Sequence, residues 1–290
     1  MASRVPTVRQ RRLGAELRRL RENQGFTADE VAERLRWSPS KVSRMETARI
    51  GARLSDVRLL LELYRLDEAH LGEVLALTQV AGQKGWWADY LSDLSESYAA
   101  FIALEDEADA ALYFEGQLIP GLCQTEEYAR QVIMGANVYA TIPPHQMDRQ
   151  IEVRLRRQRL LTRAAPLKLS VVLDESALLR CVGDQDTMRR QLVRLIELAL
   201  LPNVDLRVLP LEVPRQLVMS ESLILLRFSP AYDVTFPDVA HIEGIEATQH
   251  LDEAVTHIYR LAWGNLAAQA LDSADSIERF TQIAESTWRA

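Results

Sequence analysis

Side chains that can donate hydrogen bonds to anions and to nucleobases gather in one short stretch, SPSKVSRMETAR at 38–49. Its apolar residues Val42 and Met45 are three apart, as on the buried side of a helix. The opposite side carries Ser40, Lys41, Ser43 and Arg44. A guanidinium presents two parallel N–H donors, which match the O6 and N7 acceptors of guanine in the major groove. The spacing predicts a helix whose exposed side makes polar contacts to a ligand.

Two predicted helices position this stretch. The first, over 27–35, begins with the capping-box pair Thr27 and Glu30, and its apolar residues recur at helical spacing. The second, over 39–47, follows Ser38, a favourable N-cap residue. Only three residues separate the two helices, which is the spacing of a helix-turn-helix motif.

Three further helices complete an N-terminal domain. Leucines at helical spacing, followed by Gly25, predict a first helix over 13–24. Two more helices are predicted over 54–66 and 67–81, capped by Ser55 and Asp67. The sequence therefore predicts an all-α, five-helix domain over residues 1–81, a linker at 82–85 and a larger domain over 86–290.

The charge is divided unevenly between these domains. Residues 1–53 hold 13 Lys and Arg against 6 Asp and Glu, whereas residues 86–290 hold 18 against 30. The net charge of −7 thus hides a basic N-terminal domain attached to an acidic one. A basic module of this kind suits phosphate binding, although a solvated basic face is the alternative that the charge alone leaves open.

The residues LGAELRRLRENQGFTADEVAERLRWSPSKVSRMETARIGARLSDVRLLLELYRL, beginning at Leu13, resemble the Xre family of bacterial helix-turn-helix regulators. The resemblance implies a lambda-repressor-like fold, with Arg21 and Glu46 forming an ion pair between the first helix and the recognition helix. Two positions depart from the family pattern. Arg36 stands where a left-handed Gly is usual, and Ala28 stands where many members carry a phosphate-bracing Gln.

The resemblance also assigns DNA contacts to individual residues. The family positions that read base edges correspond to Ser40, Lys41 and Arg44, with Ser43 beside them. The residues expected at phosphates are Thr27, Ser38, Arg49, Arg53, Arg9, Arg11 and Arg12. The expected partner is double-stranded DNA, bound by a homodimer at an inverted repeat. The alternative is a helix-turn-helix used for protein contact alone.

The C-terminal domain mixes strands and helices. Strands are predicted over 167–173, 204–211 and 223–228, with weaker candidates at 111–116 and 232–236. Helices are predicted over 125–135, 147–163, 184–200 and from 247 onward. This pattern indicates a mixed α/β or α+β domain. The segments ALYFEGQLIPGLCQTEEYAR, DESALLRCVGD and NVDLRVLPL resemble the uncharacterised domain that follows Xre N-terminal domains in many actinomycete regulators.

No motif for catalysis or cofactor binding is present. The sequence has no glycine-rich phosphate loop, no G-x-S-x-G and no H-E-x-x-H. His250 and His257 are expected seven apart on one helix, which is too far to share a metal ion. We therefore expect a protein that is not an enzyme and holds no cofactor or metal.

Two charge clusters in the C-terminal domain have ordinary interpretations. Glu105, Asp106 and Glu107 are consecutive, which is typical of a solvated charge run. The arginines on the helix over 147–163 are expected to be surface or interface charges rather than a second nucleic-acid patch. With no apolar run long enough for a bilayer, the expected location is the cytoplasm, in association with the nucleoid.

Three functions remain open at this point. The first is a sequence-specific transcription regulator whose C-terminal domain serves dimerisation, partner binding or signal sensing. The second, implied by the resemblance, is an antitoxin-like protein that neutralises a small partner protein encoded nearby, with DNA binding for autoregulation. The third is a sensor of an unknown small ligand, which an apolar pocket with converging polar groups would support.

Overall fold

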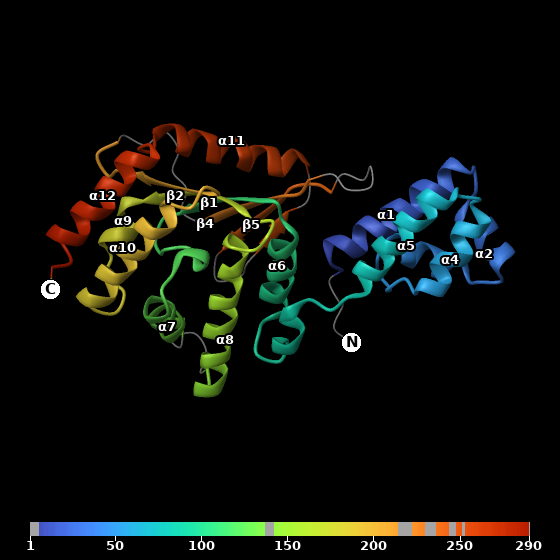
Figure 1. The fold of residues 1–290 in the computed structure, drawn as a ribbon, viewed down its shortest axis with the longest axis horizontal. Helices are drawn as coiled ribbons and strands as arrows, with labels where there is room; N and C mark the ends of the chain where they lie inside the picture. Colours follow the sequence, from blue (N-terminus) through green and yellow to red (C-terminus); the bar gives the residue numbers. More distant parts are fainter. Residues whose placement is uncertain are drawn as a thin grey trace. The chain divides into compact units, whose positions relative to one another are not determined.

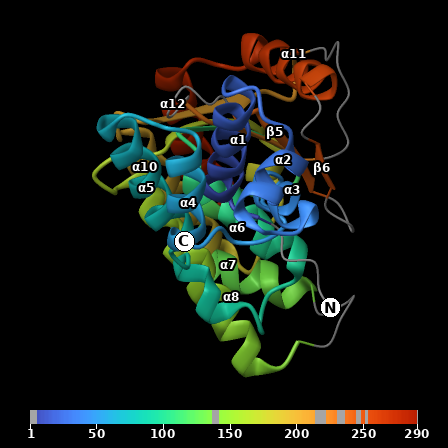
Figure 2. The same ribbon diagram turned by 90° about the vertical axis from the view of Figure 1, so that its right-hand side faces the viewer.

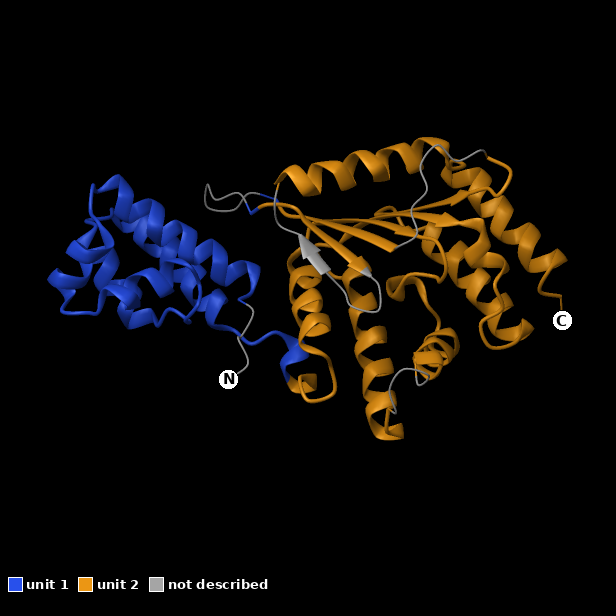
Figure 3. Cartoon of the chain, turned by 180° about the vertical axis from the view of Figure 1, so that it is seen from behind, with its two compact units in different colours: residues 1–88, 229–236 blue, residues 89–228, 237–290 orange. Residues whose placement is uncertain are grey.

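The structure is a computed structural model, and it describes residues 6–136, 142–213, 222–229, 236–243, 248–250 and 253–289. The chain divides into two compact units (Figure 3). The first unit comprises residues 1–88 and 229–236, and the second comprises 89–228 and 237–290. Each unit has its own core of buried apolar side chains.

In the part of the first unit that the structure describes, five α-helices follow one another (Figures 1 and 2). They are α1 (Val8–Asn23), α2 (Ala28–Leu35), α3 (Pro39–Glu46), α4 (Leu54–Leu63) and α5 (Glu68–Gly82). The predicted all-α, helix-turn-helix architecture is confirmed. Because α5 includes Gly82, the predicted linker at 82–85 begins inside that helix.

One helix start and one N-cap residue differ from the prediction. Helix α1 begins at Val8 rather than at residue 13. Thr7 caps it, because the Thr7 hydroxyl accepts the Gln10 N–H and the Gln10 side chain accepts the Thr7 N–H. Helix α4 has Arg53 at its N-cap, where the sequence predicted Ser55. The capping box of α1 lies upstream of the leucine pattern, so apolar periodicity alone starts this helix too late.

The core of the first unit draws on every helix. It contains Leu17, Val31, Val42, Leu61 and Leu77, none of them more than 4% exposed. Helices α1 and α3 approach most closely at Gly14, where a Cβ would lie 2.4 Å from the carbonyl oxygen of Glu46. Only glycine permits this approach, so α1 fixes the depth at which α3 packs.

The second unit is built on a six-stranded sheet of order β3-β2-β1-β4-β5-β6. The strands are β1 (Ala110–Glu115), β2 (Lys168–Asp174), β3 (Val204–Leu209), β4 (Ser222–Arg227), β5 (Val239–Glu243) and β6 (Thr248–His250). Strands β1, β2 and β3 are parallel, and β4, β5 and β6 continue the sheet in antiparallel pairs. The predicted α+β class is confirmed.

Helices cover both faces of this sheet (Figure 1). Helix α11 (Glu253–Gln269) packs on one face, where Trp263 and Leu266 contact the apolar side chains of the strands. On the other face lie α6 (Glu96–Glu107) and α8 (Pro144–Arg157). Among the described residues, the other α-helices of the second unit are α7 (Glu126–Gly135), α9 (Glu175–Leu179), α10 (Gln185–Ala199) and α12 (Ser273–Ser286).

The last third of the sheet was predicted least well. Strands β5 and β6 were not predicted, and the helix expected from residue 247 onward is wrong for 248–250, which form β6. His250 therefore lies in a strand and does not share a helix with His257. Of the candidate strand over 232–236, residues 232–235 lie outside the described residues. Both missed strands are short and polar residues interrupt them, which leaves no alternating pattern to detect.

The expected solvated charge run is wrong at Glu105, which is fully buried. Its carboxylate accepts two hydrogen bonds from the guanidinium of Arg157, both at 2.7 Å, and a third from the Tyr113 hydroxyl. Arg157 is only 4% exposed and also donates to the Tyr98 hydroxyl at 2.6 Å. This network ties α6 to α8 and to the sheet, and each charge is stable in the interior because the other neutralises it.

Candidate nucleic-acid interface

The inner side of helix α3 is buried, and its outer side is largely exposed. Val42 and Met45 are 1% and 2% exposed and belong to the core of the first unit. Ser40, Ser43 and Arg44 are exposed on the outer side. Three of the four residues on the predicted outer side of this helix are therefore exposed, and Lys41 is partly buried.

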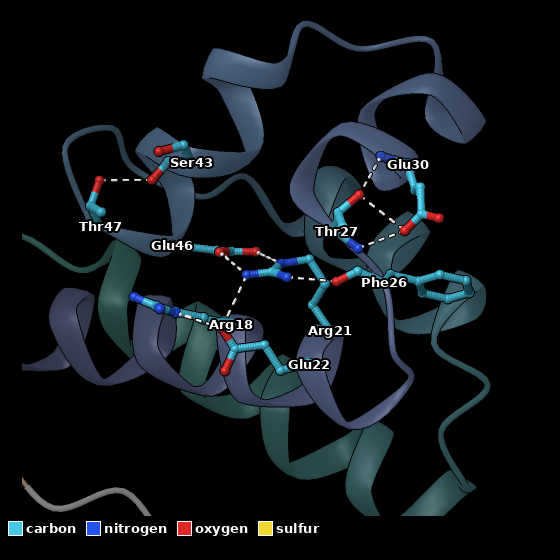
Figure 4. A network of polar contacts seen from close by, with 9 residues as sticks. All are labelled: Arg18, Arg21, Glu22, Phe26, Thr27, Glu30, Ser43, Glu46 and Thr47. Atoms are coloured by element: carbon cyan, nitrogen blue, oxygen red, sulfur yellow. Dashed lines mark hydrogen bonds and ion pairs between the residues drawn. The ribbon is translucent and has the colours of Figure 1, made fainter.

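A buried ion pair anchors the C-terminal end of α3 (Figure 4). Arg21 donates from Nε and Nη2 to the two carboxylate oxygens of Glu46, at 2.7 and 3.0 Å. Its remaining nitrogen, Nη1, donates to the carbonyl oxygen of Phe26 at 2.6 Å. One guanidinium thus joins α1, α3 and the chain leading into α2. The hydrogen bond to Glu46 is the largest influence on the pKa of Arg21, which it raises.

The turn between α2 and α3 contains a left-handed residue. Arg36 has φ 56° and ψ 41°, the conformation that glycine adopts most easily. The following Trp37 N–H donates to the carbonyl oxygen of Ala32 at 2.7 Å, which closes the end of α2. The left-handed conformation costs a non-glycine residue about 1–2 kcal/mol. The Arg36 side chain is exposed, two residues before the N-cap of α3.

The residues proposed to read bases already have partners on the protein. Arg44 Nε donates to the carbonyl oxygen of Ser40 at 3.1 Å, one turn earlier. Lys41 forms an ion pair with Asp56 of α4 at 2.7 Å, and its ammonium lies 3.6 Å from the centre of the Trp37 ring. Lys41 must leave Asp56 before it can contact a base, whereas Arg44 gives up a single exposed hydrogen bond.

The residues expected at phosphates form two groups: one lies around α2 and α3, and the other lies at the start of α1. Arg49 and Arg53 are exposed at the end of α3 and at the start of α4. Thr27 caps α2, but its N–H already donates to the Glu30 carboxylate at 2.7 Å. Ser38 lies at the N-cap of α3 without a side-chain capping bond, and its hydroxyl is 3.1 Å from that of Ser40 instead.

The three arginines at the start of α1 differ from these exposed groups. Arg9, Arg11 and Arg12 are all partly buried. Arg12 donates to the carbonyl oxygen of Ser229 at 2.6 Å, and the Arg11 guanidinium lies 5.8 Å from the Phe236 ring, both within the first unit. Burial lowers the pKa of Arg11. Arg11 and Arg12 therefore have less freedom to reach a phosphate than Arg49 and Arg53.

Sequence reasoning missed the residues that support α3. A glycine inside the predicted first helix was the available signal for the close contact at Gly14. Asp56, the partner of Lys41, gave no signal, because the pairing joins residues 15 positions apart on different helices. Trp37 packs against the core of the first unit, and the Lys41 ammonium lies over its ring.

Comparison with protein families covers both units. Residues 12–74 match a helix-turn-helix domain, a range that runs from within α1, through α2, α3 and α4, into α5. Residues 98–282 match a domain of unknown function, DUF5753. The chain belongs to the DUF5753 family. No curated protein and no solved structure matches this chain significantly.

The helix-turn-helix match indicates a DNA-binding regulator, and the DUF5753 match brings no assigned chemistry. Among the described residues of the chain, no cluster of His, Cys, Asp and Glu has the arrangement to hold a metal ion. In the same residues, no helix is both long enough and apolar enough to cross a membrane. The surface around α3 is thus the site with the clearest ligand chemistry.

Proposed function

We propose that the protein is a sequence-specific transcription regulator of the Xre type that inserts α3 into the major groove of DNA. The observation that carries the proposal is the exposed polar side of α3, on a helix whose inner side is buried and whose end is fixed by Arg21 and Glu46. A rigid helix with exposed hydrogen-bond donors suits direct reading of base edges.

Arg44 is the principal base-reading residue in this proposal. Its guanidinium can rotate away from the Ser40 carbonyl and donate two parallel hydrogen bonds to guanine O6 and N7. Ser40 and Ser43 add single hydrogen bonds to neighbouring bases. Lys41 contributes only where the complex compensates for its ion pair with Asp56, which makes it a weaker determinant of sequence.

Exposed arginines around the helix supply the contacts to phosphate. Arg49 and Arg53 flank the C-terminal end of α3, and Arg36 flanks its beginning. The N-terminal ends of α2 and α3 add backbone N–H groups and a positive helix dipole, as anion-binding helix ends do. These contacts are independent of sequence and release counterions, so affinity should fall steeply as salt concentration rises.

Selection of binding sites from random double-stranded DNA by the purified full chain tests this proposal. We expect enrichment of one inverted repeat, together with a steep decrease in affinity between low and physiological salt. Arg189→Ala, which removes an exposed arginine of the second unit, is the matched control and should leave the selected site unchanged. The proposal is overturned if selection enriches no sequence, or if binding is insensitive to salt.

A further inference from the structure

Lys41 of α3 is held between two groups of the first unit. Its ammonium lies 2.7 Å from the Asp56 carboxylate of α4 and 3.6 Å from the centre of the Trp37 ring. Trp37 in turn packs against the core of the unit. The Lys41 and Asp56 side chains are 28% and 19% exposed, so they are more sheltered than the surface pair of Arg18 and Glu22. The cation therefore has an electrostatic partner on each of two sides.

The pair of Lys41 and Asp56 attaches the first turn of α3, which has little other support. Residues 38–40 are exposed, and Ser38 forms no side-chain capping bond. The C-terminal end of the same helix is held from α1, by the ion pair of Arg21 and by the close approach of Gly14. Because α3 has only eight residues, a shift of its unsupported end would also move the side chains on its outer side.

Lys41 loses more than it gains by leaving Asp56 for a base. A hydrogen bond to a carboxylate is stronger than one to the neutral acceptors of a base edge. The Asp56 carboxylate would then lie unpaired on a surface that approaches DNA phosphates, where like charges repel each other. The contact with the Trp37 ring would be lost as well. Arg44 has no comparable cost, because its described hydrogen bond is to the neutral carbonyl of Ser40.

The choice of lysine at this position supports the same conclusion. Only three of the 34 Lys and Arg residues are lysines, and Lys41 is the single lysine within residues 1–81. A compact ammonium fits between one carboxylate oxygen and the face of a ring, whereas a guanidinium has the better shape for guanine. In a chain that uses arginine almost everywhere else, lysine here suits a contact within the protein.

We infer that Lys41 remains paired with Asp56 when α3 lies in the major groove, and that the pair positions the helix instead of reading a base. The inference rests on the proposed function and changes the role that the family resemblance implies for Lys41. A binding site holds its contact groups within about 0.5 Å of the productive geometry. The pair with Asp56 supplies that support at the first turn of α3, so it sets the direction of Ser40 and Arg44.

Binding of the full chain to the selected site and to random DNA tests the inference. Asp56→Asn and Lys41→Met should each lower the ratio of specific to random affinity by about tenfold, because α3 loses its attachment to α4. The double variant should lose no more than either single change, since each change removes the same pair. The matched control Asp29→Asn removes an equal charge from the first turn of α2 and should leave the ratio unchanged. Circular dichroism should show all four variants folded.

Base reading by Lys41 predicts a different result for Asp56→Asn. A base-reading Lys41 that is released from its carboxylate would bind the selected site as tightly as before or more tightly. Lys41→Met alone would then flatten the preference at one base pair. That pattern would overturn the inference, and so would an unchanged ratio in both Asp56→Asn and Lys41→Met.

Proton NMR of the lysine side chains follows the pair directly. The chain has only three lysines, so the signal that disappears in Lys41→Met identifies the methylene beside this ammonium. The ring current of Trp37 should shift that signal upfield, and the shift should persist on the selected site. Its loss on binding would show that Lys41 leaves Asp56, contrary to the inference. If the wild-type chain selects no sequence, the proposed function and the inference both fail; a selected repeat with an unchanged ratio in the variants refutes the inference alone.

Discussion

Replacing Arg21 by Met removes a guanidinium that joins three segments of the first unit. The side chain makes two hydrogen bonds to Glu46 and one to the Phe26 carbonyl, and it is only 9% exposed. Its loss leaves the Glu46 carboxylate nearly buried without its cation. Breaking a buried ion pair in this way costs about 3–5 kcal/mol. The Glu46 side chain is 7% exposed, so water can solvate part of its charge. We therefore expect the free energy of unfolding to decrease by an amount near the lower limit, about 3 kcal/mol.

A double-mutant cycle separates the pair from the individual side chains. Glu46→Met alone leaves the Arg21 guanidinium with the Phe26 carbonyl, so it should be less destabilising than Arg21→Met. The double variant should cost less than the two single changes together, with a coupling of about 1–3 kcal/mol, because no unpaired charge then remains. Purely additive losses would refute the idea that the two groups act as a pair.

Urea unfolding and hydrogen exchange of the full chain measure these effects. Exchange in α3 should increase more than exchange in α11, because the ion pair holds the C-terminal end of α3. Arg18→Met is the control: Arg18 pairs with Glu22 on the same helix, but both side chains are more than half exposed. This exposed pair should be dispensable for stability. Equal destabilisation by Arg18→Met and Arg21→Met would refute the argument from burial.

Three further predictions concern other parts of the structure. Gly14→Ala should destabilise the first unit by about 1–3 kcal/mol, because its Cβ would meet the backbone of α3. Gly72→Ala in α5, with open space around it, should be neutral or stabilising in the same unfolding assay. Burial lowers the pKa of His241 to about 4 from an ordinary value of 6.5. The unfolded chain therefore binds the proton first, and stability should fall as pH drops from about 6.5 to 4 and fall less in His241→Gln. Arg44→Ala should cost about 1–3 kcal/mol on the selected site and flatten preference at one base pair, whereas Arg53→Ala should weaken all sequences alike; equal losses on specific and random DNA would make Arg44 a phosphate contact.

The first unit could be predicted from sequence because its signals are local. The capping box of Thr27 and Glu30, the stop at Gly25 and the apolar pair Val42 and Met45 each lie within a few residues of the helix end or face that they specify. Such signals act before any tertiary contact forms. The α1 start was misplaced only because Thr7 caps the helix before its apolar pattern begins.

In the second unit, local sequence signals fail to predict which charged side chains are buried. Glu105 and Arg157 each looked like surface charges, and their burial depends on a pairing across 52 residues. The same difficulty applies to the two cysteines, since Cys123 is buried and Cys181 is exposed although cysteine is a residue type that is usually buried. Composition gives the average behaviour of a residue type, whereas the position of these side chains is set by which helix packs beside them.

The ion pairs of Arg21 and Arg157 show that the partners of an arginine decide whether it supports the fold or can contact a ligand. Arg21 and Arg157 are both buried and bidentate, and each joins helices that are distant in sequence. The remaining nitrogen of each guanidinium donates within the protein as well, to the Phe26 carbonyl oxygen from Arg21 and to the Tyr98 hydroxyl from Arg157, so these arginines position other groups rather than contact a ligand. Arg44 has the opposite arrangement, because one exposed hydrogen bond leaves most of its guanidinium accessible. The hydrogen-bond partners of each arginine, more than the net charge of the domain, therefore separate the arginines that stabilise this fold from those that can reach DNA.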